Sequence, residues 1–309
     1  MKEENLTRYA WLSIAAAVIT ISLKAGAYFV TGSVGLLSDA LESIINLVAA
    51  MIALWVLKIA SQPADEEHMF GHGKVEYFSS GIEGALIFVA ALSIGYAAVG
   101  RLLEPQPLEQ IGTGLIISLI ATGVNFFVAR VLLRAGQKHH SIVLEADGHH
   151  LMTDVWTSVG VVVGVGAVSF TGWLRLDPIV AILVAINILW SGWDLIKRSI
   201  QGLIDTALPK DIHEKIVAVL NNCTTPENIT YHALRTRQAG TQKFISVHIL
   251  VPGAWTVQQG HDFLEKIEIR LRQEIENSIV FTHLEPFEDP ASYEDIELNR
   301  SKKMPERNG

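Results

Sequence analysis

Six stretches of this chain are apolar over roughly 20 residues, the length that a helix needs to cross a hydrocarbon core about 30 Å thick. They predict an α-helical membrane domain of six transmembrane helices over residues 1–204. The composition agrees, with 50% hydrophobic residues, 18% charged residues and a mean hydropathy of +0.32. The stretches begin near Ala10, Gly35, Phe78, Ile111, Gly148 and Pro178.

Basic residues between these stretches predict the side of the membrane on which each link lies. The links after the second, fourth and sixth stretches are rich in lysine and arginine, whereas the opposite links carry chiefly Arg101 and Arg175. The segment MKEENLTRY has mixed charge and no small-residue cleavage site, so the first stretch is interpreted as a retained helix. We therefore expect a multi-pass protein of the cell (inner) membrane with both termini in the cytoplasm.

From Asp205 onward the pattern changes to that of a soluble domain. KDIHEKIVAVLNN and TVQQGHDFLEKIEIRLRQEIE have the apolar spacing of amphipathic helices, and ITYHALRTRQ, KFISVHILV and SIVFTHLE alternate like strands. This order predicts a small cytoplasmic α+β domain over residues 205–286, with helices over an antiparallel sheet. Residues 287–309 are polar and lack periodicity, which predicts a disordered tail.

Charge and cysteine content argue against two other classes of protein. The single cysteine, Cys223, excludes an intrachain disulfide framework and a cysteine-rich zinc ribbon. The net charge of -8 and the absence of a basic stripe argue against nucleic acid as a partner.

Ionisable side chains inside two apolar stretches are the strongest functional signal, because a charge inside a bilayer is costly and is usually kept for function. His150 and Asp154 are four residues apart and share a helix face, as do Glu42 and Asn46 on the second stretch. Together they offer the four nitrogen and oxygen donors of a tetrahedral divalent-metal site. Two alternatives stay open: these residues form only interhelical hydrogen bonds, or Asp39 is a competing ligand.

Other polar residues within the apolar stretches have no firm role. Lys24 is interpreted as reaching the membrane interface or as pairing with Glu83, and Asn125 is left without a role. His149 points away from the metal-binding face and is assigned to the interface.

Two further groups could bind metal. Asp65, His68 and His72 have spacings of three and four, which a compact loop could bring to one ion, although such a loop could equally be only solvated. In the soluble domain, histidines lie on three predicted strands and one helix, and each alone would be an ordinary surface histidine. The members of this second group are His232, His248, His261, His283 and Glu285.

The paired spacings, together with QPADEEHMFGHGK and HALRTRQAG, resemble the cation diffusion facilitator family. The similarity covers about residues 10–286 and is closest to bacterial ferrous-iron and zinc efflux pumps. It implies a homodimer that exchanges cytoplasmic divalent metal for protons, with six helices per protomer. It also implies that the cytoplasmic domain is metallochaperone-like, that is, ferredoxin-like.

The resemblance also implies functional roles for matching positions. The transport site falls on Glu42, Asn46, His150 and Asp154, which agrees with the choice made from the spacing and demotes Asp39. Asp65, His68 and His72 match a peripheral metal site, and the cytoplasmic histidines with Glu285 match a binuclear site in which the family usually has aspartate. Lys74 resembles a lysine that pairs with an aspartate, here Asp205, at the dimer contact.

The sequence therefore predicts a proton-coupled divalent-cation exporter and not an enzyme. The family usually has Asp or His where this chain has Glu42, and Asp where it has Asn46, so zinc is the first expected ion and manganese, iron or cobalt are alternatives. Protons and the lipid bilayer are the other expected partners. An intramembrane metal hydrolase and a membrane-anchored metal sensor are the rival functions, although the H-E-x-x-H signature of the former is missing from the sequence.

Overall fold

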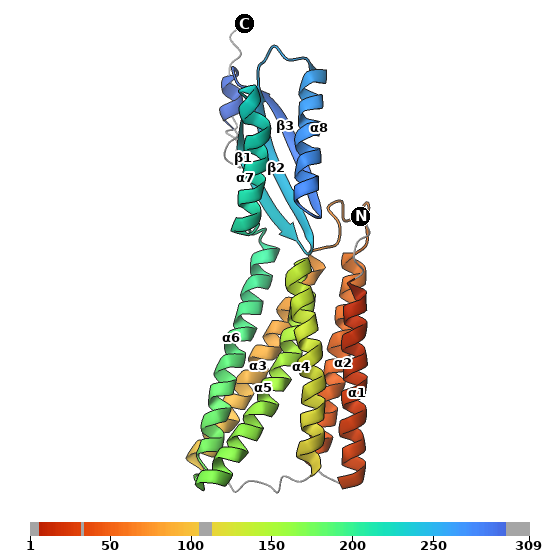
Figure 1. Ribbon diagram of the computed structural model, residues 1–309, viewed down its shortest axis with the longest axis vertical. Helices are drawn as coiled ribbons and strands as arrows, with labels where there is room; N and C mark the ends of the chain where they lie inside the picture. The colour runs from red at the N-terminus through yellow and green to blue at the C-terminus, as the bar shows by residue number, and fades with distance from the viewer. Residues whose placement is uncertain (1–5, 32–33, 105–112, 295–309) are drawn as a thin grey trace. The chain divides into compact units, whose positions relative to one another are not determined.

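The computed structural model describes residues 6–31, 34–104 and 113–294. The chain divides into two compact units, with the boundary between residues 203 and 204. In its described ranges, the first unit contains six long helices (Figure 1). The side chains of Asp39 and Glu42 lie outside the described residues. The helices are α1 (Thr7–Thr31), α2 (Val34–Ala60), α3 (Val75–Leu103), α4 (Thr113–His139), α5 (Ile142–Thr171) and α6 (Leu176–Leu203).

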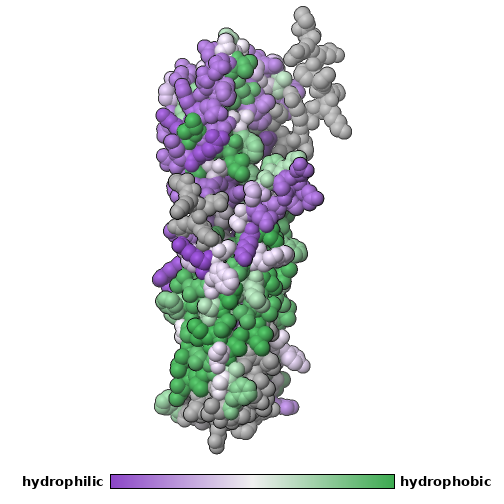
Figure 2. Space-filling view, turned by 90° about the vertical axis from the view of Figure 1, so that its right-hand side faces the viewer, coloured by the Kyte–Doolittle hydropathy of each residue, from purple (hydrophilic) through white to green (hydrophobic). Residues whose placement is uncertain are grey.

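The helices of the first unit have the apolar character of membrane spans. Over the described residues, four segments are long and apolar enough to cross a membrane: Thr7–Gly26, Val75–Leu103, Leu119–His139 and Pro178–Leu203. Apolar side chains gather over much of the surface of this unit (Figure 2), and large ones such as Trp55 and Trp190 are exposed. α5 begins at Ile142, earlier than the predicted start at Gly148, because its first turns bury Glu145 and Asp147.

Two apolar cores hold the six helices together, and α5 contributes to both. Leu54, Leu132 and Leu144 belong to the core that α1, α2, α4 and α5 share. The second core joins α3 and α6 to α5, and Ile188 is among its fully buried side chains. At Gly84 a Cβ would come within 3.1 Å of the Ile196 backbone nitrogen. Small residues therefore let α3 and α6 approach closely, as is common between membrane helices.

Polar contacts fix the beginning of α5, the helix that carries His150 and Asp154. Ser141, at its N-cap, donates its hydroxyl to Glu76 Oε2 on α3 at 2.8 Å. One turn later, Glu145 forms an ion pair with Arg198 on α6. Both acidic side chains are buried, and a negative charge near a helix N-terminus is favourable. These contacts position α5 against α3 and α6.

The second unit is a three-stranded sheet with two helices. β1 and β2 pair antiparallel as predicted, whereas β2 and β3 pair parallel. The expectation of an antiparallel sheet is therefore wrong for β3, because the helix α8 carries the chain back across the sheet before β3 begins. The elements are α7 (Lys210–Thr224), η1 (Thr225–Glu227), β1 (Thr230–Ala239), β2 (Gln242–Val251), α8 (Val257–Glu274), β3 (Ser278–Pro286) and η2 (Pro290–Tyr293).

Alternation along the strands gives the sheet one apolar and one polar face. Ile245, Val247 and Ile249 of β2 are fully buried in a core with residues of α7 and α8. His248 lies between two of them in sequence and therefore points to the opposite face. A capping box of Thr256 and Gln259 begins α8.

Ordered chain continues beyond Pro286, where the tail was expected to begin. Asp289 caps the short helix η2 by accepting the Ala291 backbone N–H at 2.9 Å. Ser292 donates its hydroxyl to the Pro286 carbonyl at 2.7 Å. Residues 287–294 thus fold back onto the end of β3, while residues 295–309 lie outside the described residues.

Candidate metal centres

Asn46 of α2 lies between His150 and Asp154 of α5. His150 Nε2 is 2.8 Å from Asn46 Oδ1, and Asn46 donates its Nδ2–H to Asp154 Oδ2 at 2.5 Å. The Asn46 side chain is only 4% exposed. Two adjacent helices therefore bring an imidazole, an amide and a carboxylate to one point inside the helical unit.

This arrangement is compatible with both interpretations of the predicted transport site, a divalent-metal site and a set of interhelical hydrogen bonds without metal. The three described side chains bond to one another between helices, as the metal-free alternative expects, and the same contacts place three metal-donor groups side by side. The Glu42 and Asp39 side chains are outside the described residues, so their contributions stay predictions.

Two other intramembrane polar groups can be compared with expectation. His149 Nδ1 lies 2.9 Å from the Ser191 hydroxyl on α6, so His149 contacts a neighbouring helix, and its position at the membrane interface stays a prediction. Neither Glu83 carboxylate oxygen has a hydrogen-bond partner. The suggested pairing of Glu83 with Lys24 is therefore wrong.

Asp65, His68 and His72 converge in the link between α2 and α3. Asp65 Oδ1 is 3.2 Å from His68 Nδ1, and its Oδ2 is 3.2 Å from His72 Nε2. One donor atom from each of the three residues lies within 4.8 Å of the other two. Donors that share a tetrahedral zinc ion at about 2.0–2.1 Å are themselves about 3.3 Å apart, so the group fits one ion.

The backbone of this link holds the carboxylate in place. Asp65 Oδ1 accepts the backbone N–H groups of His68 at 2.6 Å and Glu67 at 3.0 Å. The His68 backbone N–H, helped by the nearby imidazoles of His68 and His72, holds the pKa of Asp65 below its ordinary value. Gly71 has a φ of 81°, which a residue with a Cβ adopts only with strain. The link is thus shaped to keep an ionised oxygen ligand facing two imidazoles.

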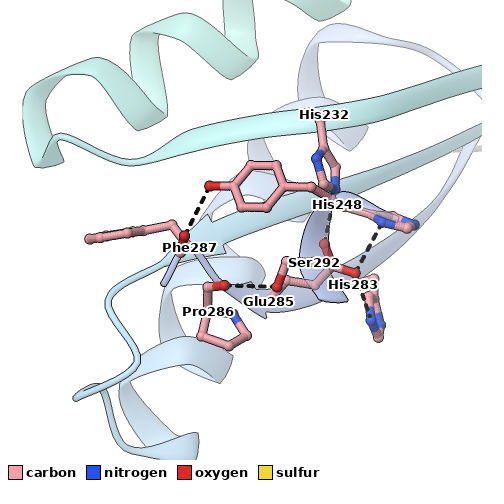
Figure 3. A network of polar contacts seen from close by, with 8 residues as sticks. His232, His248, His283, Glu285, Pro286, Phe287 and Ser292 are labelled. Carbon is pink, nitrogen blue, oxygen red and sulfur yellow. Dashed lines mark hydrogen bonds and ion pairs between the residues drawn. The ribbon is translucent and has the colours of Figure 1, made fainter. Parts of the chain in front are cut away.

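The second unit brings His232, His248, His283 and Glu285 together at the polar face of its sheet (Figure 3). Glu285 Oε2 lies 2.9 Å from His232 Nε2, and its Oε1 lies 3.3 Å from both His248 Nδ1 and His283 Nε2. Glu285 is buried, whereas His283 is 63% exposed. One carboxylate therefore faces three imidazoles, which is the arrangement that a carboxylate bridging two ions would require.

Strand register explains why these side chains meet. His232 is paired with His248 across β1 and β2, and His248 is paired with His283 across β2 and β3. The donors of His232, His248 and Glu285 lie within 4.8 Å of one another, and their chemistry suits zinc and related ions. A β-bulge directly after His232 shifts the register of β1. Such bulges commonly redirect a side chain next to a functional site.

His261 is not brought to this group within one chain. It is exposed on α8, and α8 packs through Gly260, Phe263 and Ile267, which are buried. Sequence reasoning missed Tyr293 of η2, whose ring meets His232 edge-on with centroids 6.1 Å apart. The Tyr293 hydroxyl donates to the Phe287 carbonyl at 2.9 Å. Only its aromatic character within a polar segment could have drawn attention to Tyr293.

Lys74 and Asp205 belong to different units, so their pairing stays a prediction. Within the first unit, Lys74 donates its ammonium group to the Leu203 carbonyl at 3.3 Å. Within the second unit, Asp205 Oδ1 accepts from Arg237 at 3.3 Å.

Comparison with known proteins agrees with this geometry. Residues 10–204 match the model of the cation efflux transmembrane domain, and residues 208–287 match that of the cation efflux protein cytoplasmic domain. An uncharacterized transporter of Synechocystis sp. is 54% identical over 289 residues, covering 93% of this chain and 92% of that protein. The cation-efflux pump FieF of Klebsiella pneumoniae is 30% identical over 281 residues, covering 91% of this chain and 93% of that protein. The cation-efflux pump FieF of Shewanella oneidensis is 30% identical over 274 residues, covering 89% of this chain and 92% of that protein.

The matched relatives are transporters and not enzymes, and the two FieF proteins are cation-efflux pumps. Together the two domain models span most of the sequence, including every candidate metal ligand. The chain therefore belongs to the cation diffusion facilitator family.

Proposed function

We propose that this protein exports divalent metal cations from the cytoplasm in exchange for protons, with zinc as the first candidate and iron, manganese or cobalt as alternatives. The observation that carries the proposal is the contact of Asn46 with both His150 and Asp154 inside a bundle of apolar helices. Ionisable side chains at such a position are rarely kept for packing alone. The family membership supports cation efflux as the direction of transport.

Proton coupling follows from the chemistry of the ligands. His150 and Asp154 must be deprotonated to bind a cation, so loading releases protons, and protonation from the other side of the membrane expels the ion. Histidine suits this exchange because its ordinary pKa of about 6.5 lies close to the pH of the cell. Movement of helices would expose the site to each side in turn.

The ligand set bears on the choice of ion. One imidazole, two carboxylates and one amide, supplied by His150, Asp154, Glu42 and Asn46, form a harder set than a histidine-rich zinc site. The amide also contributes no charge. Iron, manganese and cobalt are therefore realistic cargoes beside zinc.

The two outer groups are proposed to regulate or stabilise transport. Metal bound by Glu285 and its three histidines would fix the second unit, which we propose as the main contact of a homodimer in the inner membrane. The loop group of Asp65, His68 and His72 would bind a separate ion. We propose that both termini are cytoplasmic, so that the cytoplasmic group samples the metal concentration that export must control.

Transport by purified protein in sealed proteoliposomes tests this function. A metal-sensitive dye inside the vesicles reports entry of zinc, manganese, iron, cobalt or cadmium in turn, with and without an imposed pH gradient. We expect flux of at least one ion. This flux should be faster when the imposed proton gradient drives protons in the direction opposite to the movement of the metal. Absence of flux for all five ions would refute export, and flux that is indifferent to the gradient would refute antiport.

A further inference from the structure

A cavity of about 430 Å³ lies between α4 and α6, and none of the candidate metal groups uses it. α4 and α6 both pack against α5, and residues of all three helices line the cavity, so α5 forms the floor of a groove. The volume falls within the range of about 300–1,000 Å³ that is usual for sites that bind small molecules. This groove is defined by Arg130 of α4, His149 and Trp156 of α5, and Asn187, Trp190 and Asp194 of α6.

The two walls of the groove carry opposite charges. Arg130 lies on the α4 wall and Asp194 on the α6 wall, and both side chains are exposed. Among the described residues, neither forms a hydrogen bond or an ion pair with another side chain. The groove therefore offers one positive and one negative group to a ligand, and its two charges sum to zero.

Both charged residues lie at the edge of the apolar part of their helices. Residues 113–129 of α4 and 178–193 of α6 contain no charged side chain. At about 1.5 Å per residue, each of these stretches spans about 25 Å, which is close to the hydrocarbon core of about 30 Å. Arg130 and Asp194 therefore lie at the level where acyl chains give way to lipid headgroups.

The deeper part of the groove contains aromatic and amide side chains. Trp190 is 79% exposed and Trp156 is 45% exposed, and tryptophan is enriched where the membrane meets water. Asn187 lies seven residues before Asp194 on the same face of α6 and is exposed. An amide in hydrocarbon is costly without a hydrogen-bond partner. Asn187 has none among the described residues, so a ligand with an acceptor oxygen at this depth would satisfy it.

A hydrogen bond between helices fixes the floor of the groove. His149 Nδ1 lies 2.9 Å from the Ser191 hydroxyl, which joins α5 to α6. One turn later on α5, Thr153 donates its hydroxyl to the His149 carbonyl at 3.0 Å. The floor and one wall are thus held together without a ligand, so the groove is already formed.

The charges and the depth of the groove select a phospholipid headgroup. A phosphate group would accept charge-assisted hydrogen bonds from the Arg130 guanidinium, and a primary ammonium group would donate them to the Asp194 carboxylate. A headgroup with a net negative charge would be repelled by Asp194. A choline group has no N–H with which to donate to that carboxylate. The headgroup of a phosphatidylethanolamine has the phosphate and the primary ammonium group, without net charge.

We propose that this groove binds one phospholipid of the phosphatidylethanolamine class. Its phosphate lies against Arg130, its ammonium group against Asp194, and an ester carbonyl oxygen accepts from Asn187. Its acyl chains pass over Trp156 and Trp190 into the hydrocarbon core. The lipid thereby joins α4 to α6 across α5, and this role does not depend on which ion the protein carries.

Native mass spectrometry of the purified full-length protein tests the site. The protein is mixed with equal amounts of phosphatidylethanolamine, phosphatidylcholine and phosphatidylglycerol, and the lipid retained by each chain is identified. We expect one phosphatidylethanolamine per chain, bound about tenfold more weakly by Arg130→Gln and by Asp194→Asn, since a hydrogen bond to a charged group is lost in each. Arg134→Gln, an exposed change one turn further along α4 and outside the cavity lining, is the matched control and should bind like the parent.

Each alternative occupant gives a different result. Equal retention of phosphatidylcholine would show that no N–H donation to Asp194 is involved, and preference for phosphatidylglycerol would show that Arg130 alone attracts the headgroup. A groove covered by a second copy of the chain would retain no lipid, and the two variants would instead lower the fraction of dimer. Any of these outcomes, or retention that is equal in the parent and both variants, would overturn the proposal.

Thermal unfolding in lipid nanodiscs gives a second measurement, which does not require the lipid to survive in the gas phase. The parent and Arg134→Gln should melt at a higher temperature in nanodiscs that contain phosphatidylethanolamine than in nanodiscs of phosphatidylcholine alone. This difference should disappear in Arg130→Gln and in Asp194→Asn. A difference of the same size in all four proteins would assign the effect to the bilayer as a whole and would overturn the site.

Discussion

Asn46 donates a hydrogen bond from its side-chain amide to the carboxylate of Asp154 on the neighbouring helix, at 2.5 Å. In this contact the carboxylate is met by a neutral dipole. An ion that replaces this contact gains the full attraction of the carboxylate, while the amide can turn its oxygen toward the ion. The pair defines the two transport-site variants that are most informative.

Asp154→Asn should abolish or strongly reduce metal flux while leaving a folded protein. The change keeps the size of the side chain and removes a negative charge that would attract the cation. Metal affinity should therefore fall by about tenfold or more, which corresponds to about 1.4 kcal/mol or more, measured by calorimetry and by flux into proteoliposomes. Asp262→Asn, an exposed change on α8, is the matched control. Near-parental transport by Asp154→Asn would remove this residue from the site.

Asn46→Asp should make metal binding tighter at high pH and more steeply dependent on pH. The new carboxylate faces that of Asp154, so the two would share a proton that the metal must displace. If Asn46 only packs, the change leaves an unpaired charge that costs about 2.5–3.5 kcal/mol on insertion scales. Metal affinity measured against pH distinguishes these outcomes. If metal affinity depends on pH in the same way in the parent and in Asn46→Asp, and the ranking of metals is unchanged, then Asn46 is excluded from the transport site. Asp39 would again become a candidate ligand.

His232→Ala combined with His283→Ala should reduce stabilisation of the second unit by metal. This unit has its own apolar core, and an ion that binds only the folded state stabilises it by about 2.7 kcal/mol at a hundredfold excess over Kd. The melting temperature of a fragment beginning at residue 204, with and without zinc, measures the effect. His213→Ala is the control, and His261→Ala tests the assignment of that residue from sequence. If zinc raises the melting temperature of the double variant as much as that of the parent, this site is ruled out.

Tyr293→Ala should weaken metal binding at the cytoplasmic group by about two- to tenfold, because an aromatic pair is worth about 0.5–1.5 kcal/mol. Tyr293→Phe keeps the ring that meets His232 and removes the hydrogen bond to Phe287, so most of the affinity should remain. Zinc titration of the two variants separates ring packing from the hydrogen bond. Equal affinity of the parent and Tyr293→Ala would show that η2 does not support the group.

Gly71→Ala should loosen the link between α2 and α3, since a Cβ at a positive φ costs about 1–2 kcal/mol. The contacts that lower the pKa of Asp65 weaken, so this pKa should rise toward its ordinary value of about 3.9. Because the folded pKa is lowered, the stabilisation it provides is present above the ordinary pKa and is lost as the pH falls through the folded one. An NMR titration of Asp65 measures the shift. An unchanged pKa in the variant would contradict this account of the turn.

The helical part of the fold was predictable because its signal is local. Long apolar stretches identify helices whatever they pack against, and the six helices begin close to the predicted positions. α5 is the exception, since Glu145 and Asp147 are polar in sequence but buried by contacts with other helices. The parallel pairing of β2 with β3 was also missed. Period-two alternation places residues on a face and carries no information about strand direction.

The candidate sites were likewise predictable from sequence only where their signal is local. Spacing alone brought His150 and Asp154 to one helix face and selected Glu42 and Asn46 as their counterparts. The three strand histidines could be grouped only through resemblance, because their proximity depends on register between distant segments. Tyr293 was not found, since its role depends on a contact between η2 and β1 that no local pattern encodes.

The place of β3 as the last strand in chain order has a consequence for biosynthesis. His283 and Glu285 lie on the last strand of the sheet, after α8, so the cytoplasmic metal group cannot form until translation has passed them. By that stage all six helices of the first unit have already been synthesised. A nascent chain therefore completes this candidate metal group only after its membrane helices have been made.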